Sequence, residues 1–405
     1  MQITKLELEE FRCFRHLELA WVPAGLRLVG ANGTGKTSLV EALYLLATTK
    51  SFRAPADRYL IHRASGQDLG VPPYARIAGH IETRTGRHTL EIGLLFDATN
   101  STVSKRYRRD GRPVRAMDFV GTFRVVLFSP EDIELITGSP QVRRRFLDIV
   151  LSTIDSTYLR ALAQYTRILE QRNSLLKQLS GHDDHTIEEQ LAFWDDQLVT
   201  YGTYLIVARI RFLFGWSNDL TESFARLSAR TLTLTTRYVS TIPLPDPIAD
   251  ELSQLPLAEA QASVSLRYRQ VLARSRNDEL RRGSTVFGPH RDDVQWMLDG
   301  ELLAAVGSRG IQRLAVIAAK LAEIAAIYRA TEDWPVLLLD DALSELDGQH
   351  RNRLLAALAT LPAQKVLTAA EPSTLRHPTI DSLPLARLVD GTVAFDEPAT
   401  DERHA

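Results

Sequence analysis

The stretch "LVGANGTGKTSLVEALYLL", Leu28 to Leu46, decides the fold class of this chain. An apolar run precedes the glycines and apolar residues recur at helical spacing after them, which predicts a strand, a turn and a helix. The spacing of the turn is that of a phosphate-binding loop. Within it, we expect Lys36 to have a catalytic role by bridging the β- and γ-phosphates. The Thr37 hydroxyl is expected to complete the coordination shell of a Mg²⁺ ion. The predicted phosphate-binding residues are Gly30, Ala31, Asn32, Gly33, Thr34, Gly35, Lys36, Thr37 and Ser38.

The alternative for this stretch is a chance glycine turn before a surface helix. The flanking strand and helix disfavour it, because the motif requires that context. The glycines have a physical role, since they let backbone amides turn inward around a phosphate at a helix N-terminus. The sequence therefore predicts a site for ATP and Mg²⁺.

Composition sets the class of protein more broadly. The chain has 405 residues, of which 44% are hydrophobic, and a formal net charge of −2. This length suffices for two lobes with full cores, and the charge means that any contact with nucleic acid depends on local basic patches. Cys13 is the only cysteine, which excludes internal disulfides and cysteine-rich zinc sites. The start of the chain lacks the apolar core of a signal peptide, so we expect a cytoplasmic protein without membrane contact.

A second acidic element lies far from the phosphate-binding loop. "VLLLDD", Val336 to Asp341, is an apolar run that ends in two carboxylates. Asp340 is placed to hold Mg²⁺, and Asp341 to orient and deprotonate the attacking water. Taken alone, the pair is equally well read as a polar strand end. The surrounding sequence strengthens the first interpretation.

Two short motifs surround this strand in an order that resembles ABC-type ATPase heads. "GSRGIQ" opens a helix of about twenty residues before the strand, and "SELD", Ser344 to Asp347, follows it. The resemblance implies that Ser308 and Gly310 contact the γ-phosphate held by a second copy of the chain. ATP would then close a dimer and hydrolysis would release it.

The elements predict a discontinuous head and a helical insertion. Residues 1–138 and 284–400 are expected to form the ATPase head, 139–283 a helical lobe, and 401–405 a tail. After Gly283, short strands are expected in "STVFGPH", "VQWMLDG" and "WPVLLLDD". The insertion lacks sustained heptads and is broken by glycines and by Pro243, Pro245 and Pro247. The predicted fold class is α/β, an ABC-type ATPase head with a mixed P-loop sheet and helices, plus a helical second lobe.

Over essentially its whole length the chain resembles the RecF family of bacterial recombination-repair mediators. The match rests on "FRCF", "SFR", "SPEDIELITGSPQVRRRFLD", "FGPHRDD", "SRGIQR" and "LLLDDALSELD". The resemblance implies a cytoplasmic protein of DNA replication, DNA repair, recombination and the SOS response. It implies a homodimer that forms on ATP at single-stranded, gapped or junction DNA and helps RecO and RecR load RecA. It also implies a slow, DNA-stimulated ATPase used as a switch.

The chain departs from the family pattern at several places. Ile311 stands where the signature usually has glutamine, and Asp341 where many heads have glutamate. The histidine expected after the next strand is absent from "KVLTAAEPS", and the usual Q-loop glutamine has no clear position. The shorter Asp341 side chain fits slow hydrolysis.

Basic residues suggest where DNA could bind. A hairpin turn at Asp110-Gly111 follows Lys105, Arg106, Arg108 and Arg109, which we predict to contact DNA phosphates. Tyr107 could stack on a base. The alternative is a solvated basic face.

Other basic residues have equally plausible structural roles. For Arg143 to Arg145, ion pairs with the acids of "SPED" are the alternative to DNA contact. For His290 in "GPHRDD", we expect a structural role that pairs this segment with the head. Arg12 and Arg53 are expected to reach a phosphate or to form surface ion pairs.

Three hypotheses follow for the function. The first is a nucleotide-gated DNA clamp, and the second is an ABC-type ATPase subunit that energises transport or another partner complex. The third is a phosphotransferase acting on a small molecule. Ser308 and "SELD" oppose the third, since simple P-loop kinases lack both, and the length of the insertion opposes the second.

Overall fold

The computed structural model describes residues 1–68, 70–179, 187–228, 232–244, 252–344 and 346–395. The predicted tail at 401–405, two of the three prolines and Glu345 of "SELD" lie outside these residues. Two compact units are formed, Met1–Asp132 with Ile324–Ala405 and Ile133–Glu323. The second unit thus includes residues 284–323, which the sequence pattern places in the ATPase head. Domain borders at 139 and 284 stay a prediction.

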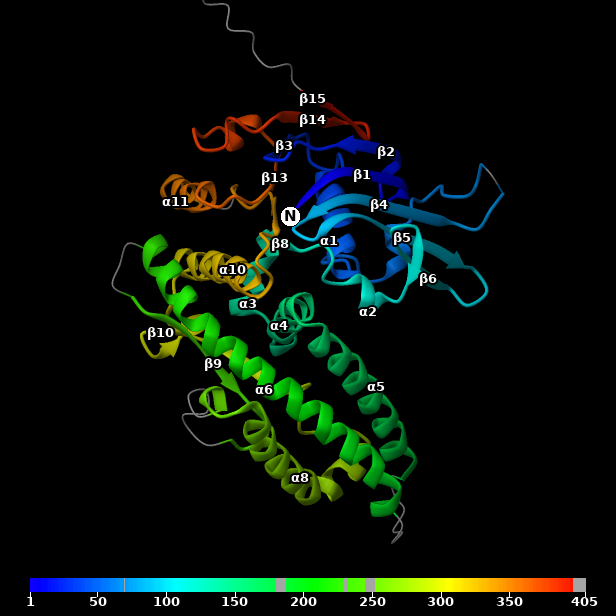
Figure 1. The fold of residues 1–405 in the computed structure, drawn as a ribbon, viewed down its shortest axis with the longest axis vertical. Helices are drawn as coiled ribbons and strands as arrows, with labels where there is room; N and C mark the ends of the chain where they lie inside the picture. The colour runs from blue at the N-terminus through cyan, green and yellow to red at the C-terminus, as the bar shows by residue number, and fades with distance from the viewer. Residues whose placement is uncertain (69, 180–186, 229–231, 245–251, 345, 396–405) are drawn as a thin grey trace, which may run out of the picture. The chain divides into compact units, whose positions relative to one another are not determined.

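The first unit contains most of the strands (Figure 1). Its strands are β1 (Gln2–Phe11), β2 (Phe14–Ala20), β3 (Gly25–Val29), β4 (Tyr74–Thr83), β5 (Gly86–Asp97), β6 (Thr102–Arg109), β7 (Arg112–Val114), β8 (Val125–Phe128), β12 (Val336–Asp340), β13 (Lys365–Ala369), β14 (Leu385–Val389) and β15 (Thr392–Phe395). Its helices are α1 (Lys36–Thr48), α2 (Ala116–Phe119) and α11 (Gly348–Ala359). These elements form two six-stranded sheets.

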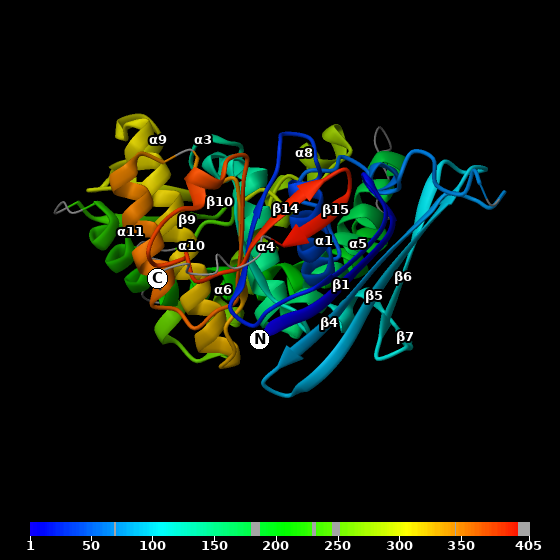
Figure 2. The same cartoon turned by 90° about the horizontal axis from the view of Figure 1, so that it is seen from above.

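One sheet, ordered β2-β1-β4-β5-β6-β7, is antiparallel throughout. Figure 2 shows β4, β5 and β6 side by side as long strands. The other sheet is ordered β15-β14-β3-β13-β12-β8, and its five strands β14, β3, β13, β12 and β8 are parallel, with β15 antiparallel to β14. α1 contacts strands of both sheets, and its apolar side chains join one core with them. The phosphate-binding helix is therefore held from two sides.

The second unit is mainly helical. It contains α3 (Glu134–Thr137), α4 (Pro140–Ile154), α5 (Ser156–Leu179), α6 (Ile187–Ser228), α8 (Leu257–Arg282), α9 (Leu303–Val306) and the sheet β9 (Leu234–Val239), β10 (Asp293–Leu298) and β11 (Glu301–Leu302). α10 (Arg309–Thr331) includes the border between the units. By length and composition alone, α6 is apolar enough to cross a membrane, and 56% of its most apolar window is buried.

A buried ion-pair network joins three helices of this unit. Arg172 on α5 donates to Asp195 on α6 at 2.7 Å and to Glu279 on α8 at 2.6 Å. The side chains of Arg172 and Glu279 are fully buried. Arg276 on α8 pairs with the same Asp195. Because buried charges are stable only when they are paired, this network fixes the relative positions of α5, α6 and α8.

The prediction of a strand in "STVFGPH" is wrong. Residues 284–290 form turns and irregular chain, and the next strand is β10. Gly288 has a φ of 129°, and a Cβ there would lie 2.1 Å from the Tyr268 hydroxyl. Pro289 follows it, so neither residue suits a regular strand. The other two strands predicted in this part of the chain, "VQWMLDG" and "WPVLLLDD", are confirmed by β10 and β12.

Candidate functional site

The phosphate-binding loop connects β3 to α1, as the sequence predicts. Gly33 and Gly35 have φ values of 86° and 113°, which side chains rarely tolerate. A Cβ at Gly35 would lie 2.5 Å from the Cys13 sulfur, so close packing also requires glycine there. Nothing lies within 4 Å of a Cβ built at Gly33. The loop is thus tightly packed at Gly35 and open at Gly33.

Lys36 begins α1 and is 7% exposed. Its ammonium donates to the carbonyl oxygens of Gly30 at 2.6 Å and Ala31 at 3.0 Å. Burial lowers the pKa of Lys36, against the opposing effect of Asp341 and Asp340. Among the described residues no carboxylate lies within salt-bridge distance of this ammonium. An anion in the loop would supply the negative charge that Lys36 lacks.

The buried carboxylate of Asp340 lies next to Thr37. The Thr37 hydroxyl donates to Asp340 Oδ1 at 3.2 Å, and Asp340 is only 5% exposed. Burial raises the pKa of Asp340. A divalent cation would favour its ionised form, and a hydroxyl beside a carboxylate is a donor set that Mg²⁺ accepts. The residues present therefore fit the predicted metal.

Thr368 links the two acids at the end of β12. Its hydroxyl donates to Asp340 Oδ1 at 2.8 Å and accepts the Asp341 amide N–H at 3.1 Å. β13 lies between β3 and β12, and Thr368 pairs in register with Asp340. Asp341 itself has a φ of 51°, an uncommon backbone conformation for a non-glycine residue. Thr368 thus helps to hold a strained turn beside the Asp340 carboxylate.

Loss of the Thr368 hydroxyl should weaken metal binding. We expect Thr368→Val to raise the Mg²⁺ concentration needed for ATP binding by about 10- to 100-fold, as removal of such supporting hydrogen bonds does. Thr368→Ser keeps the hydroxyl and should therefore need the same Mg²⁺ concentration as the wild type. Mg²⁺ titration of the binding of a fluorescent ATP analogue measures both. An unchanged Mg²⁺ requirement in Thr368→Val would contradict the role.

Glu41 is a site residue that the sequence analysis missed. It is fully buried on α1 and receives hydrogen bonds from Arg12 at 2.7 and 2.8 Å and from Arg53 at 3.1 and 3.2 Å. Arg53 also donates to the Ser38 hydroxyl of the phosphate-binding loop at 2.9 Å. Burial opposes ionisation of Glu41, but bonds from Arg12 and Ser51 outweigh it and its pKa is lowered. Arg12 and Arg53 therefore form ion pairs, but their partner is the buried Glu41 and not an acid at the surface.

The signature residues lie at the start of α10. Ser308 precedes the helix, and its side chain accepts the Ile311 amide N–H at 3.4 Å. Gly310 is exposed, and the only atom near a Cβ built there is the Ser308 hydroxyl at 4.0 Å. A helix N-terminus with an exposed serine and an exposed glycine suits a phosphate contact. Contact with the nucleotide of a second copy stays a prediction.

The basic hairpin has two different faces. β6 and β7 pair with Arg109 opposite Arg112 across the Asp110-Gly111 turn, as predicted. Lys105 is paired with Asp57 at 2.7 Å, and Arg109 donates to the Asp118 carbonyl at 3.1 Å. Arg106 is exposed, and Arg108 is 59% exposed with Glu91 3.5 Å away. Arg106 and Arg108 are thus the more exposed members of this set, and DNA contact by any of the four residues stays a prediction.

Tyr107 and the "SPED" pairing require correction. Tyr107 packs against Phe119, with 5.4 Å between the ring centroids, so its ring already has a partner inside the protein. Arg143 pairs with Asp293 at 2.7 Å, and Arg144 donates to the Asp292 carbonyl at 2.6 Å, so these two arginines have partners other than the acids of "SPED". Pairing of Arg145 with those acids stays a prediction.

The role of "GPHRDD" is structural, as expected, but its partners differ from those expected. His290 is 2.6 Å from the Tyr165 hydroxyl on α5. Buried Asp292 accepts from Tyr238 at 2.6 Å and from Thr241 at 2.7 and 2.8 Å. All of these partners lie in the helical unit, not in the first unit.

The parallel sheet with the phosphate-binding loop after β3 and paired acids after β12 defines an ATPase head of the ABC and SMC class. The family model described as the RecF/RecN/SMC N terminal domain matches residues 2–381. The chain belongs to the RecF family: it is 63% identical, over 96% of its length and 99% of the relative, to the DNA replication and repair protein RecF of Thermomicrobium roseum. It is 39% identical to that of Herpetosiphon aurantiacus over 92% and 94% of the two chains.

Solved structures agree with this assignment. A RecF-ATP structure of the RecFOR pathway matches with a TM-score of 0.82 and 27% identity over 97% of both chains. The Smc head domain of Pyrococcus furiosus matches with a TM-score of 0.52 and 16% identity over 97% of this chain and 95% of that one. The second likeness concerns the fold alone.

Proposed function

We propose that this chain is an ATP-gated DNA-binding protein of recombinational repair and replication-fork maintenance. The observation that carries the proposal is the Thr37–Asp340 contact at 3.2 Å, which joins the phosphate-binding loop to the paired acids in one site. The RecF structure solved with ATP supports ATP as the nucleotide. Family membership supports DNA as the target and RecO and RecR as partners that help load RecA.

The residues of the site have distinct tasks in this proposal. The loop amides and Lys36 hold the phosphates, while Thr37 and Asp340 hold Mg²⁺, which would neutralise phosphate charge. Asp341 orients a water and accepts its proton. Ser308 and Gly310 bind the γ-phosphate of the second copy, so that the dimer closes with ATP and opens after slow hydrolysis.

The direct test compares DNA binding with and without ATP. Gapped, duplex and single-stranded DNA are titrated while dimerisation is followed by light scattering. We expect ATP to increase both dimerisation and affinity, with a preference for DNA that contains a gap or junction. Absence of DNA binding in every nucleotide state would overturn the proposal. ATP-driven dimerisation without DNA binding would favour the alternative, an ATPase subunit that energises another partner complex.

Ser308 separates ATP binding from dimer closure. Ser308→Ala should bind ATP normally, because the phosphate loop is unchanged, but should form the ATP-dependent dimer about 150- to 25,000-fold less well. The estimate follows from the loss of a hydrogen bond to a charged group at each of two equivalent sites. Ser240→Ala, which removes a hydroxyl that accepts the Ile242 amide N–H at 3.1 Å outside the site, is a matched control for dimer formation. Normal dimerisation of Ser308→Ala would exclude the shared site.

The exposed arginines of β6 predict a salt effect. Replacing Arg106 and Arg108 with glutamine should reduce the slope of log affinity against log salt on duplex DNA by about 0.9 per lost phosphate contact. Arg87→Gln is a control, because Arg87 is an 85% exposed arginine at the β4–β5 turn of the same sheet. An equal slope for wild type and the double variant would show that this face is only solvated.

A further inference from the structure

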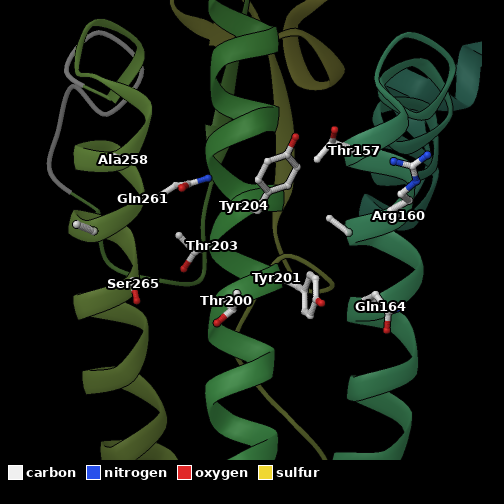
Figure 3. A pocket seen from close by; sticks show the side chains of 12 residues that line it. Thr157, Arg160, Gln164, Thr200, Tyr201, Thr203, Tyr204, Ala258, Gln261 and Ser265 are labelled. Atoms are coloured by element: carbon white, nitrogen blue, oxygen red, sulfur yellow. The ribbon is translucent and has the colours of Figure 1, made fainter.

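A groove of about 700 Å³ lies among α5, α6 and α8 of the helical unit (Figure 3). α6 stands between the other two helices, and side chains from all three line the space. The volume is in the range of small-ligand sites. The lining residues are Thr157, Arg160, Ala161, Gln164, Thr200, Tyr201, Thr203, Tyr204, Ala258, Gln261, Ala262 and Ser265.

The charge of the groove favours an anion. Among the residues that the structure describes, Arg160 is the only charged one that lines the groove, and no described carboxylate or lysine lines it. Within the described part of the chain, Arg160 has no ion pair or hydrogen bond, in contrast to Arg172 three turns further along α5. An unpaired guanidinium at the edge of a groove is a phosphate-binding group.

The remaining polar groups favour an occupant that can form hydrogen bonds. Thr203 is 3% exposed, and its hydroxyl has no hydrogen-bond partner among the described residues. Gln164 on α5 and Gln261 on α8 carry side-chain amides on opposite sides of α6. A purely apolar side chain from a partner protein would leave these groups unsatisfied, which costs free energy.

Two tyrosines supply an aromatic surface. Tyr201 and Tyr204 are half-buried and three residues apart on α6, so they lie on the same face of the helix. The Tyr204 hydroxyl donates to Asp155 at 3.0 Å, which orients its ring. Burial raises the pKa of Tyr204 to about 12, so this hydroxyl stays neutral at physiological pH. Tyr201 has no such bond to any residue that the structure describes, and its side chain lines the groove.

We propose that this groove binds one nucleoside phosphate unit, with the base on Tyr201, its edge hydrogen-bonded by Gln164 or Gln261, and its phosphate on Arg160. The unit is either a free nucleotide or one nucleotide of a single-stranded DNA. The inference goes beyond the ATPase site, because the groove lies wholly within residues 133–323. If the unit is a nucleotide of single-stranded DNA, the inference rests on the proposed function. If the unit is a free nucleotide, the inference is independent of the proposed function.

The test uses 2-aminopurine, whose fluorescence is quenched when the base stacks. The full chain is titrated with 2-aminopurine deoxyribonucleoside monophosphate and with a single-stranded oligonucleotide that contains one 2-aminopurine. We expect quenching with at least one probe. Tyr201→Ala should weaken that binding by about 5- to 150-fold, the range for loss of one stacked base. Arg160→Gln should weaken it and, on the oligonucleotide, reduce the salt slope by about 0.7.

Matched controls separate the groove from the rest of the chain. Phe193→Ala removes an exposed ring from α6, and Arg167→Gln removes an exposed arginine from α5, both outside the groove. Both should leave quenching unchanged. Circular dichroism checks that the Tyr201→Ala variant keeps its helices. Arg160→Gln is a second test variant, at an exposed residue.

The outcomes distinguish this inference from the proposed function. If wild type binds DNA but quenches neither probe, the groove proposal fails and the proposed function stands. Quenching of the monophosphate without any DNA binding supports the groove as a nucleotide site while the proposed function fails. Quenching that is equal in wild type, Tyr201→Ala and Arg160→Gln overturns the groove proposal, because stacking then occurs elsewhere.

Discussion

Lys36→Ala is expected to reduce ATP affinity by about 30- to 5,000-fold, the range for losing one partner of a buried, hydrogen-bonded charge pair. The ammonium already occupies the loop, where it donates to the Gly30 and Ala31 carbonyls, and no carboxylate in the described ranges lies at salt-bridge distance from it. The phosphates would supply that missing charge, so most of their electrostatic binding depends on this residue. Titration with a fluorescent ATP analogue measures the loss.

Lys365 provides a closely matched control for this prediction. It is also a partly buried lysine whose pKa is lowered by burial, and it donates to the Leu361 and Ala363 carbonyls at 2.9 Å. It lies at the start of β13 and pairs with Gly25, at the opposite end of the sheet from the phosphate-binding loop. Lys365→Ala should therefore bind ATP as wild type does. Equal ATP affinity in Lys36→Ala and wild type would remove the loop from the proposed site.

Arg172→Met is expected to lower the free energy of unfolding by about 3–5 kcal/mol, because it leaves Glu279 in the core without its closest cation. Both side chains are fully buried, and Arg172 also donates to the Thr285 hydroxyl at 2.7 Å. The remaining contact of Glu279 with Arg276 is 3.8 Å long and compensates poorly. Urea unfolding followed by tryptophan fluorescence measures the change.

Two further variants test the cause of this loss. Arg172→Met combined with Glu279→Leu should recover much of the stability, since apolar replacement of a whole buried pair is often neutral. Arg269→Met removes a largely exposed partner of Asp196 and should change the free energy of unfolding by less than about 1 kcal/mol. A similar small effect for Arg172→Met would mean that water reaches the buried network.

The sequence predicted those parts of the site that are local in the chain. The loop around Lys36, the strand before Asp340 and the helix after Ser308 each depend on a short pattern, and the structure contains all three elements. Glu41 was missed because it appears as one polar residue in an apolar helix. Its arginine partners, Arg12 and Arg53, come from separate segments, so no spacing in the sequence identifies the cluster.

Features that depend on neighbouring strands could not be predicted. Thr368 gains its role because β13 lies between β3 and β12, and sheet order is a property of the whole fold. The basic hairpin was correctly placed, but only the alternation along β6 shows that Lys105 and Arg109 are engaged within the protein. Tyr107 follows the same alternation and is half-buried, with its ring packed against Phe119.

The position of β3 in its sheet also determines when the site can form during synthesis. The two strands that flank β3 in the sheet are β13 and β14. They emerge from the ribosome about 330 to 360 residues after β3. A nascent chain that ends before Lys365 therefore exposes an apolar strand with two open edges, which favours aggregation until the last strands arrive. Such a chain already contains the complete GANGTGKTS loop, yet it lacks the strands that hold this loop in place. Nucleotide binding by ribosome-bound chains of increasing length would consequently report completion of the sheet.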